Sequence, residues 1–236
     1  LRREALPTYE TELIDTLNRT GSARVYELPG ADFANYRWGG TVDPVMPGLL
    51  DRPYLAKEQV PQGAPATADL VNALERRLYE GWFEPAALRP VMDLLGIGTV
   101  VTRNDLQYER YRLARPGYLW PLVNEGLGPP TFTGPVVEDR PVIAMVDEQY
   151  YAHGGASSFP TVAAFDVDPQ RSLIDTAPVG TPMIVAGDGD GLVDLAAAGL
   201  LDESRAIIPA AGDPATVDAA LGQPDAWTVI TDTNRR

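Results

Sequence analysis

A long stretch near the N-terminus carries the mixture of side chains that proteins use to bind sugars. Between Ala31 and Pro65 the sequence reads ADFANYRWGGTVDP and, a few residues later, GLLDRPYLAKEQVP. Aromatic rings can stack on the apolar face of a sugar, while carboxylates and guanidinium groups make charge-assisted hydrogen bonds to its hydroxyls. The candidates for substrate contact are Asp32, Tyr36, Arg37, Trp38, Asp51, Arg52 and Tyr54. A second interpretation stays open, in which the rings only fix the loop to its own domain or to a neighbouring membrane-embedded part.

A second candidate site follows a run of apolar residues in VVTRNDLQYERYR (Val100–Arg112). Arg103, Asn104 and Asp105 stand where an expected buried strand ends, and ligands of α/β proteins bind at strand ends. The same three residues could instead cap the strand and form a buried ion pair with the long loop. We keep both interpretations.

The stretch VAGDGDGLVD (Val185–Asp194) invites comparison with two kinds of ligand loop. An EF-hand calcium loop needs oxygen ligands at positions 1, 3, 5 and 12 around a glycine at position 6. With Gly191 at position 6, positions 1 and 12 are alanines. The dinucleotide fingerprint also fails, because a leucine or an aspartate takes the place of its third glycine. We therefore predict a strand-to-helix turn in which Asp188 or Asp190 caps the helix, and no metal site.

Residue types needed for several kinds of catalysis are scarce. The chain has no cysteine, which excludes disulfides and thiolate nucleophiles, and a single histidine, His153. That histidine lies in YYAHGGASSFP, a glycine- and serine-rich stretch without the G-x-S-x-G pattern that exposes a nucleophilic serine. We expect no catalytic residue and no cofactor in this chain.

The charge distribution restricts the partners. The net charge is −14, and residues 116–236 hold only 5 Lys and Arg against 17 Asp and Glu. A surface this acidic repels phosphate backbones and anionic headgroups, so nucleic acid is not an expected partner. No apolar run reaches the roughly 18 residues that span a bilayer. Together with a start at Leu1, this predicts a soluble segment of a longer protein.

Hydrophobic periodicity indicates the elements that must position the candidate residues. We expect helices at Thr8–Arg19, from an N-cap at Thr67 to Gly81, and at Pro85–Leu95. Strands are expected at Ala23–Leu28 and Ile97–Arg103, where they can lie as parallel neighbours. Residues 1–113 then form an N-terminal α/β subdomain with a long aromatic and acidic loop at 31–65.

The rest of the chain divides into a connection and a second unit. Residues 114–140 are rich in proline and glycine and are expected to form a hinge. Residues 141–236 are expected to form an acidic α/β subdomain, with strand candidates at 141–147 and 161–167. Its last sixty residues alternate strands with short helices, which predicts a mostly parallel sheet. The fold class is therefore α/β, with two small subdomains.

Several phrases together resemble a known family. They are LPGADFANYRWGGTVDPVMPGLLDRPYLAKEQVP, ALERRLYEG, TRNDLQYERYR, VAGDGDGLVDLAAAGLL and the terminal TDTNRR. From about residue 20 to 236, and more thinly across 114–180, the chain resembles the extracytoplasmic portion of actinobacterial polytopic α-(1→3)-arabinofuranosyltransferases. These are membrane glycosyltransferases of the GT-C type.

The resemblance implies a function for the longer protein. Such enzymes transfer arabinofuranose from a decaprenyl-phosphate donor to the arabinan of arabinogalactan or lipoarabinomannan. The implied partners are a membrane-embedded GT-C domain of the same polypeptide, the arabinan acceptor and the lipid-linked donor. The family's catalytic aspartate lies on a loop near its first membrane helices, and we match it to no residue here. The segment then either positions acceptor or donor, or acts as a scaffold that touches no substrate.

Overall fold

The computed structural model describes residues 5–57, 63–111, 113–138, 158–174, 176, 181–201 and 205–231. The strand expected at 141–147 and the loop around His153 lie outside these residues. Within the described ranges, no helix combines the length and the apolar character that crossing a bilayer requires.

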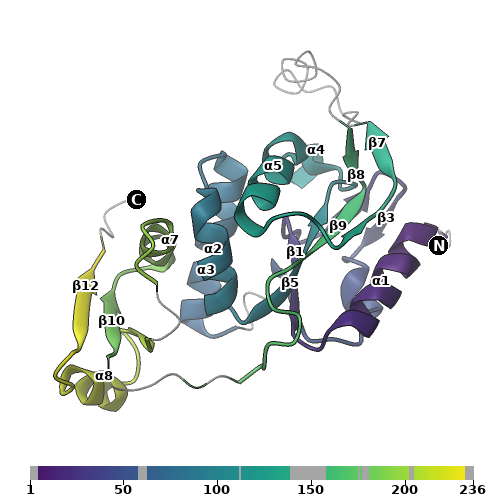
Figure 1. Ribbon diagram of the computed structural model, residues 1–236. Coiled ribbons are helices and arrows are strands. Elements are labelled where there is room, and N and C mark those ends of the chain that lie inside the picture. The colour runs from purple at the N-terminus through teal and green to yellow at the C-terminus, as the bar shows by residue number, and fades with distance from the viewer. Residues whose placement is uncertain are drawn as a thin grey trace.

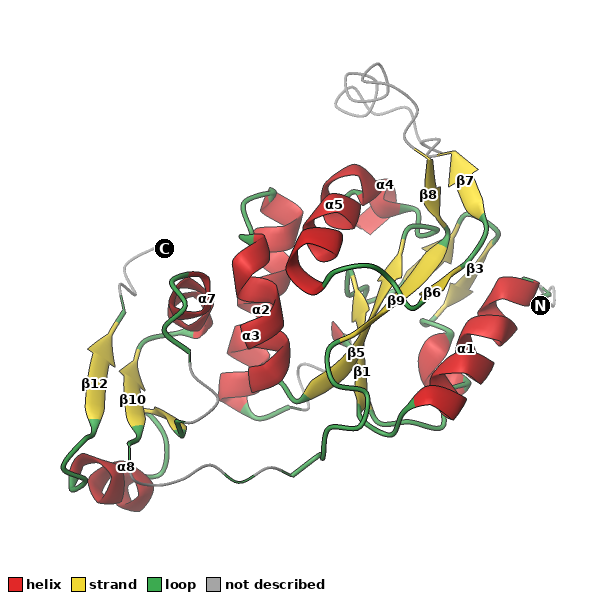
Figure 2. Ribbon diagram, viewed as in Figure 1, coloured by secondary structure: helices red, strands yellow, loops and turns green. Residues whose placement is uncertain are grey.

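A five-stranded mixed sheet forms the centre of the molecule (Figures 1 and 2). In spatial order its strands are β4 (Tyr54–Leu55), β1 (Arg24–Leu28), β5 (Ile97–Arg103), β9 (Val162–Asp166) and β6 (Phe132–Thr133). β1 runs parallel to both β4 and β5, as expected for the two long strands, whereas β9 is antiparallel to β5 and β6. The carboxyl ends of β4, β1 and β5 therefore meet at one edge of the sheet.

Helices cover both faces of this sheet (Figure 2). One face carries α2 (Pro65–Glu80), α3 (Pro85–Leu94) and α5 (Pro116–Leu127), and the other carries α1 (Thr8–Thr20). Side chains of β5 alternate accordingly, because Val100 packs in the cluster with α2, α3 and α5 while Val101 packs in the cluster with α1. All seven residues of β5 are buried.

Three of these helices begin with proline. Pro65, Pro85 and Pro116 each occupy the first turn, where the backbone amide would have no helical partner and the fixed φ favours the helix. Thr67, expected as the N-cap of α2, therefore lies inside the helix instead. Gly81 ends α2 as expected, with a left-handed φ of 79°.

The stretch expected to be a hinge carries regular structure. Residues 114–140 hold α5, β6 and β7 (Val136–Glu138), and β7 pairs with β8 (Ser158–Pro160). Leu119, Leu122 and Val123 of α5 lie in the largest hydrophobic cluster. Proline content suggested a connection, but Pro116 opens the helix rather than breaking it. The five-stranded sheet draws strands from both sides of this stretch.

The long loop is also ordered in its described part. A hairpin of β2 (Ala34–Tyr36) and β3 (Gly39–Val42) is followed by a 3-10 turn, η1 (Met46–Gly48), and then by β4. A small separate core holds the hairpin against the chain after β5, which includes α4 (Tyr108–Tyr111).

A parallel three-stranded sheet occupies the C-terminal part, as predicted. β10 (Met183–Ala186) lies between β11 (Ile207–Pro209) and β12 (Trp227–Ile230), and both neighbours are parallel to it. The helices are α7 (Gly189–Ala197) and α8 (Pro214–Leu221). Val193 and Ala196 of α7 pack in the large cluster with α2 and α3, which joins the second sheet to the first unit (Figure 1). The α/β fold class is confirmed.

Candidate functional site

A buried arginine organises the carboxyl end of β5. The Arg103 guanidinium is fully buried and donates to two carboxylates, through Nε and Nη2 to Asp105 at 3.1 and 3.0 Å and through both terminal nitrogens to Glu10 of α1. A third carboxylate, that of Glu27 at the end of β1, lies 3.9 Å away. We call these four residues the Arg103 network.

Three aromatic side chains contact the Arg103 network. The Tyr9 hydroxyl and the Trp38 indole N–H both donate to Oδ2 of Asp105, at 2.9 and 3.2 Å. The Tyr36 ring lies 4.7 Å below the Arg103 guanidinium and stacks on Trp38 with its centroid 4.7 Å away. The network thus ties α1, β1, β5 and the β2–β3 hairpin together.

Burial sets the protonation of the Arg103 network. Desolvation alone would lower the pKa of Arg103, but the surrounding carboxylates raise it well above its usual value. Desolvation raises the pKa of the Glu10 carboxyl, and this outweighs the opposing charge of Arg103. Burial also raises the pKa of the Tyr9 hydroxyl, which keeps its proton as a donor to Asp105.

Of the ten sequence-predicted residues, Arg103 and Asp105 belong to this network, and Tyr36 and Trp38 contact it. Asn104 lies beside it and donates its side-chain amide to the carbonyl of Pro160 at 2.9 Å. Tyr36, Arg103, Asn104 and Asp105 are buried, and Trp38 is half-buried. The ion pairs of Arg103 are with Glu10 of α1, Glu27 of β1 and the neighbouring Asp105, and the long loop contributes the Tyr36 and Trp38 rings.

The other predicted residues do not join the network. Arg52 is buried and donates to the carbonyls of Leu17 and Ala23 and to the Thr99 hydroxyl. Arg37 pairs with Glu109 at 3.1 Å. Asp32 and Asp51 are exposed, and they contact Lys57 and Asn18 respectively. Tyr54 is half-buried at the wall of a small pocket.

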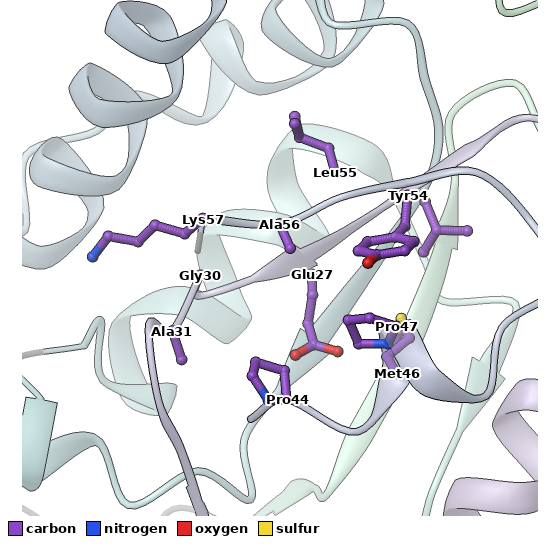
Figure 3. A pocket seen from close by; sticks show the side chains of 11 residues that line it. Glu27, Gly30, Ala31, Pro44, Met46, Pro47, Tyr54, Leu55, Ala56 and Lys57 are labelled. Atoms are coloured by element: carbon purple, nitrogen blue, oxygen red, sulfur yellow. The ribbon is translucent and has the colours of Figure 1, made fainter. Parts of the chain in front are cut away.

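That pocket lies where β1 and β4 end (Figure 3). The Glu27 carboxylate points into it between Pro44, Pro47 and the Tyr54 ring, whereas the Lys57 side chain extends away. Its volume of about 10 Å³ is about the space of one water molecule. Pro44, Met46 and Pro47 of the long loop therefore leave little free space at the carboxyl ends of β1 and β4.

A second, more open cleft shares Gly30 and Lys57 with this pocket, and we call it the Glu75 pocket. It has a volume of about 380 Å³, within the range of roughly 300–1,000 Å³ typical of small-molecule sites. Its polar and aromatic lining comes from Lys57, Asn72, Glu75, Arg76, Tyr79 and Tyr111. Sequence analysis missed Glu75. The sequence did hold a signal for its burial, because Glu75 stands next to Leu74 and on the same face of the helix as the buried Val71 and Leu78.

Glu75 is buried at the floor of this pocket. Its Oε1 accepts a short hydrogen bond from the Tyr26 hydroxyl and one of 2.9 Å from the Gly30 amide. Desolvation raises the pKa of the Glu75 carboxyl, and this outweighs the opposing effect of the Tyr26 hydrogen bond. The carboxyl therefore holds its proton to higher pH in the folded chain than in the unfolded chain.

This difference predicts how Glu75→Gln changes the pH dependence of stability. The raised folded pKa contributes stability that is present below the unfolded pKa, about 4.3, and is lost as pH rises through the folded pKa. Each pH unit between the two values should change the difference in unfolding free energy between wild type and Glu75→Gln by about 1.4 kcal/mol, in favour of the variant. Urea denaturation from about pH 5 to about pH 8 measures this difference. Glu125→Gln, at an exposed position of α5, is the control; parallel pH curves for wild type and Glu75→Gln would contradict the assignment.

The glycine-rich turn before α7 allows the start of this helix to pack closely against α2. Asp188 is the N-cap, and its side chain accepts from the Gly191 amide at 3.0 Å, a contact worth about 1 kcal/mol. The Gly189 amide donates to the Asp69 carboxylate of α2 at 2.5 Å. A Cβ on Gly189 would lie 2.4 Å from the Asp69 carbonyl oxygen, so only glycine lets the two elements approach this closely.

The next two aspartates of that stretch hold α7 against α2. Arg77 is buried and donates to Asp190 at 2.8 Å and to Asp194 at 2.7 Å, while its guanidinium lies 4.3 Å above the Trp82 ring. Asp190 also pairs with Arg76. Of the two expected caps, Asp188 is therefore the cap and Asp190 binds arginine. No group of three or more His, Cys, Asp or Glu suited to a metal ion occurs in the part of the chain that the structure describes.

Comparison with known proteins identifies the family to which this chain belongs. Residues 3–236 match the family model described as alpha-(1->3)-arabinofuranosyltransferase, N-terminal GT-C domain. The alpha-(1->3)-arabinofuranosyltransferase of Mycobacterium tuberculosis is 34% identical over 117 residues, 48% of this chain and 8% of that protein. The protein of the same name from Mycolicibacterium smegmatis is 31% identical over 153 residues, 64% of this chain and 10% of that protein.

A solved structure is similar as well. The cryo-EM structure of the arabinofuranosyltransferase AftD from Mycobacteria superimposes with a TM-score of 0.61 and 25% identity. The match covers 81% of this chain and 15% of that chain, so this chain corresponds to a small part of its relatives. The family model, by contrast, covers nearly every residue here. The chain belongs to the alpha-(1->3)-arabinofuranosyltransferase family, within its N-terminal GT-C domain.

Proposed function

We propose that this chain is one segment of a longer membrane arabinofuranosyltransferase. The longer protein transfers arabinofuranose from decaprenyl-phosphate-arabinose to the arabinan of arabinogalactan or lipoarabinomannan. The segment lies on the extracytoplasmic face as a part of the GT-C domain, beside the membrane-embedded part of the same polypeptide. It supplies no catalytic residue or cofactor and positions the acceptor or the donor. The family match supports the transfer reaction.

The open Glu75 pocket is the observation that supports a positioning role. The residues first considered for substrate contact are largely engaged in the interior, as the Arg103 network and Arg52 illustrate. They stabilise the loop rather than present free groups to a ligand. The Glu75 pocket, in contrast, is large enough for a small molecule and offers exposed rings.

Burial in the long loop supports the alternative, a scaffold without substrate contact. The Tyr36 ring is fully buried and Trp38 stacks on it, so these rings pack under their own loop. If the segment is a scaffold, substitutions in it should change the amount of folded enzyme. If it positions the acceptor, substitutions at the contact should change the KM for acceptor while the amount of folded enzyme stays constant.

A transfer assay tests the proposed reaction. Purified full-length polypeptide is incubated with radiolabelled decaprenyl-phosphate-arabinofuranose and a synthetic arabinofuranose oligosaccharide. We expect labelled arabinofuranose to appear on the oligosaccharide in α-(1→3) linkage, as determined by linkage analysis. Intact donor together with unlabelled oligosaccharide, under conditions in which the polypeptide is folded, would overturn the proposed reaction.

A further inference from the structure

We propose that the Glu75 pocket binds one uncharged sugar ring, with Tyr79 against the face of the ring and Glu75 and Asn72 at its hydroxyls. This inference rests on the proposed function and assigns the positioning role to one site. None of these three residues belongs to the long loop or to the Arg103 network.

The floor of the pocket carries a buried polar group that faces the cleft. Glu75 is only 6% exposed yet lines the pocket. Among the described residues, Tyr26 and Gly30 donate hydrogen bonds to Glu75, and both bonds are accepted by Oε1 and not by Oε2. A Cβ on Gly30 would lie 2.6 Å from Oε1, so the glycine lets the carboxyl reach this position. A sugar hydroxyl is a matching partner for a buried carboxyl.

Two tyrosine rings line the pocket. Tyr79 is 48% exposed, and the Tyr111 hydroxyl accepts a hydrogen bond from the Asn35 side-chain amide at 2.5 Å. The exposed Phe33 ring lies 6.1 Å from the Tyr111 ring. Exposed rings at a cleft can cover the apolar face of a sugar.

The outer face of α2 brings the polar and aromatic groups together. Asn72, Arg76 and Tyr79 follow each other at helical spacing, so they share one face. Within the described ranges, the Asn72 amide and the Tyr79 hydroxyl make no hydrogen bond or ion pair with protein, which leaves both available to a ligand.

Charge favours an uncharged ligand over a phosphate. The two cations at the rim already have partners: Lys57 lies 3.8 Å from Asp32, and Arg76 pairs with Glu80 and Asp190. The chain as a whole carries a net charge of −14. A phosphate would have to displace these carboxylates, whereas a neutral sugar would not.

Site-specific crosslinking of the full-length polypeptide tests the inference. The probe is an arabinofuranose hexasaccharide carrying a diazirine, and crosslinks to α2 peptides are quantified by mass spectrometry while unlabelled hexasaccharide competes. Tyr79→Ala should raise the half-competing concentration by about fivefold or more, the ratio expected for the loss of one ring contact. Asn72→Ala, at an exposed helix position, should act in the same direction without affecting the fold.

Trp227→Ala is the matched control, because that ring is 47% exposed and lies on β12, outside the Glu75 pocket. Wild-type competition in both Tyr79→Ala and Asn72→Ala would overturn the inference, as would competition by inorganic phosphate but not by the hexasaccharide. If the transfer assay fails while α2 crosslinking remains sensitive to Tyr79, only the proposed reaction is overturned. If transfer proceeds and both variants bind as wild type, only the pocket assignment is overturned.

Discussion

Replacing Arg103 with alanine is expected to lower the free energy of unfolding by about 3–5 kcal/mol, the cost of breaking a buried ion pair by removing one partner. The reason is the excess of carboxylates around it. Arg103 is the cation that contacts Glu10, Asp105 and Glu27, and it is fully buried. Its removal would leave buried carboxylates facing a cavity. Chemical denaturation monitored by circular dichroism measures the change.

Arg110→Ala is the control for Arg103→Ala, because Arg110 is exposed on α4. It should change stability by less than about 0.5 kcal/mol, as surface substitutions usually do. Arg103→Ala should also expose Tyr36 and Trp38, so quenching of tryptophan fluorescence should increase. A loss below about 1 kcal/mol for Arg103→Ala would show that the ion pairs hardly exceed their desolvation cost.

Arg77→Ala is expected to cost about 2–4 kcal/mol and to release α7 from α2. Arg77 is 3% exposed, but Asp190 and Asp194 are more exposed, so the cost should fall below that of a fully buried pair. Burial alone would lower the pKa of Arg77, but the hydrogen bonds that Arg77 donates to Asp194 and Asp190 raise it. Hydrogen exchange should report faster opening of α7, together with the three-stranded sheet.

Arg76→Ala provides a graded control. Arg76 contacts the same Asp190 but is 43% exposed, so its loss should cost only about 0–1 kcal/mol. The α2 helix remains in both variants, which isolates the contact with α7. Equal effects of the two substitutions, or exchange that rises uniformly across the chain after Arg77→Ala, would contradict a local docking role.

Regular elements were the part of the fold that sequence predicted best. Pro85–Leu95 was expected as a helix and is α3 (Pro85–Leu94), and the apolar run Ile97–Arg103 is β5. Both have strong local signals, namely an initial proline and a β-branched apolar run. The parallel pairing of β1 with β5 also followed, because helices separate the two strands.

Contacts between residues distant in the sequence determine three features that local patterns did not predict: the helix in 114–140, the burial of Tyr36 and the burial of Glu75. Prolines in 114–140 suggested a hinge, yet α5 packs its leucines in the core. Aromatic residues of the long loop suggested an exposed binding surface, but Tyr36 is buried because Arg103 and Trp38 stack on it. Glu75 went unnoticed because a glutamate in a helix usually faces solvent. Its partners, Tyr26 and Gly30, are more than forty positions away in the sequence.

The turn that begins α7 lies at the position where a parallel sheet of this kind would bind a ligand. β10 is the middle strand of its sheet, with neighbours on both sides, and the crevice beyond such a strand is where open parallel sheets bind ligands. Here the amide at the start of the helix already holds the Asp69 carboxylate. A free anion would have to compete with a tethered one, whose effective concentration reaches the millimolar range or above. At the switch point of the second sheet, the position of a ligand is thus taken by a carboxylate of the same chain, which contributes to the docking of α7 on α2.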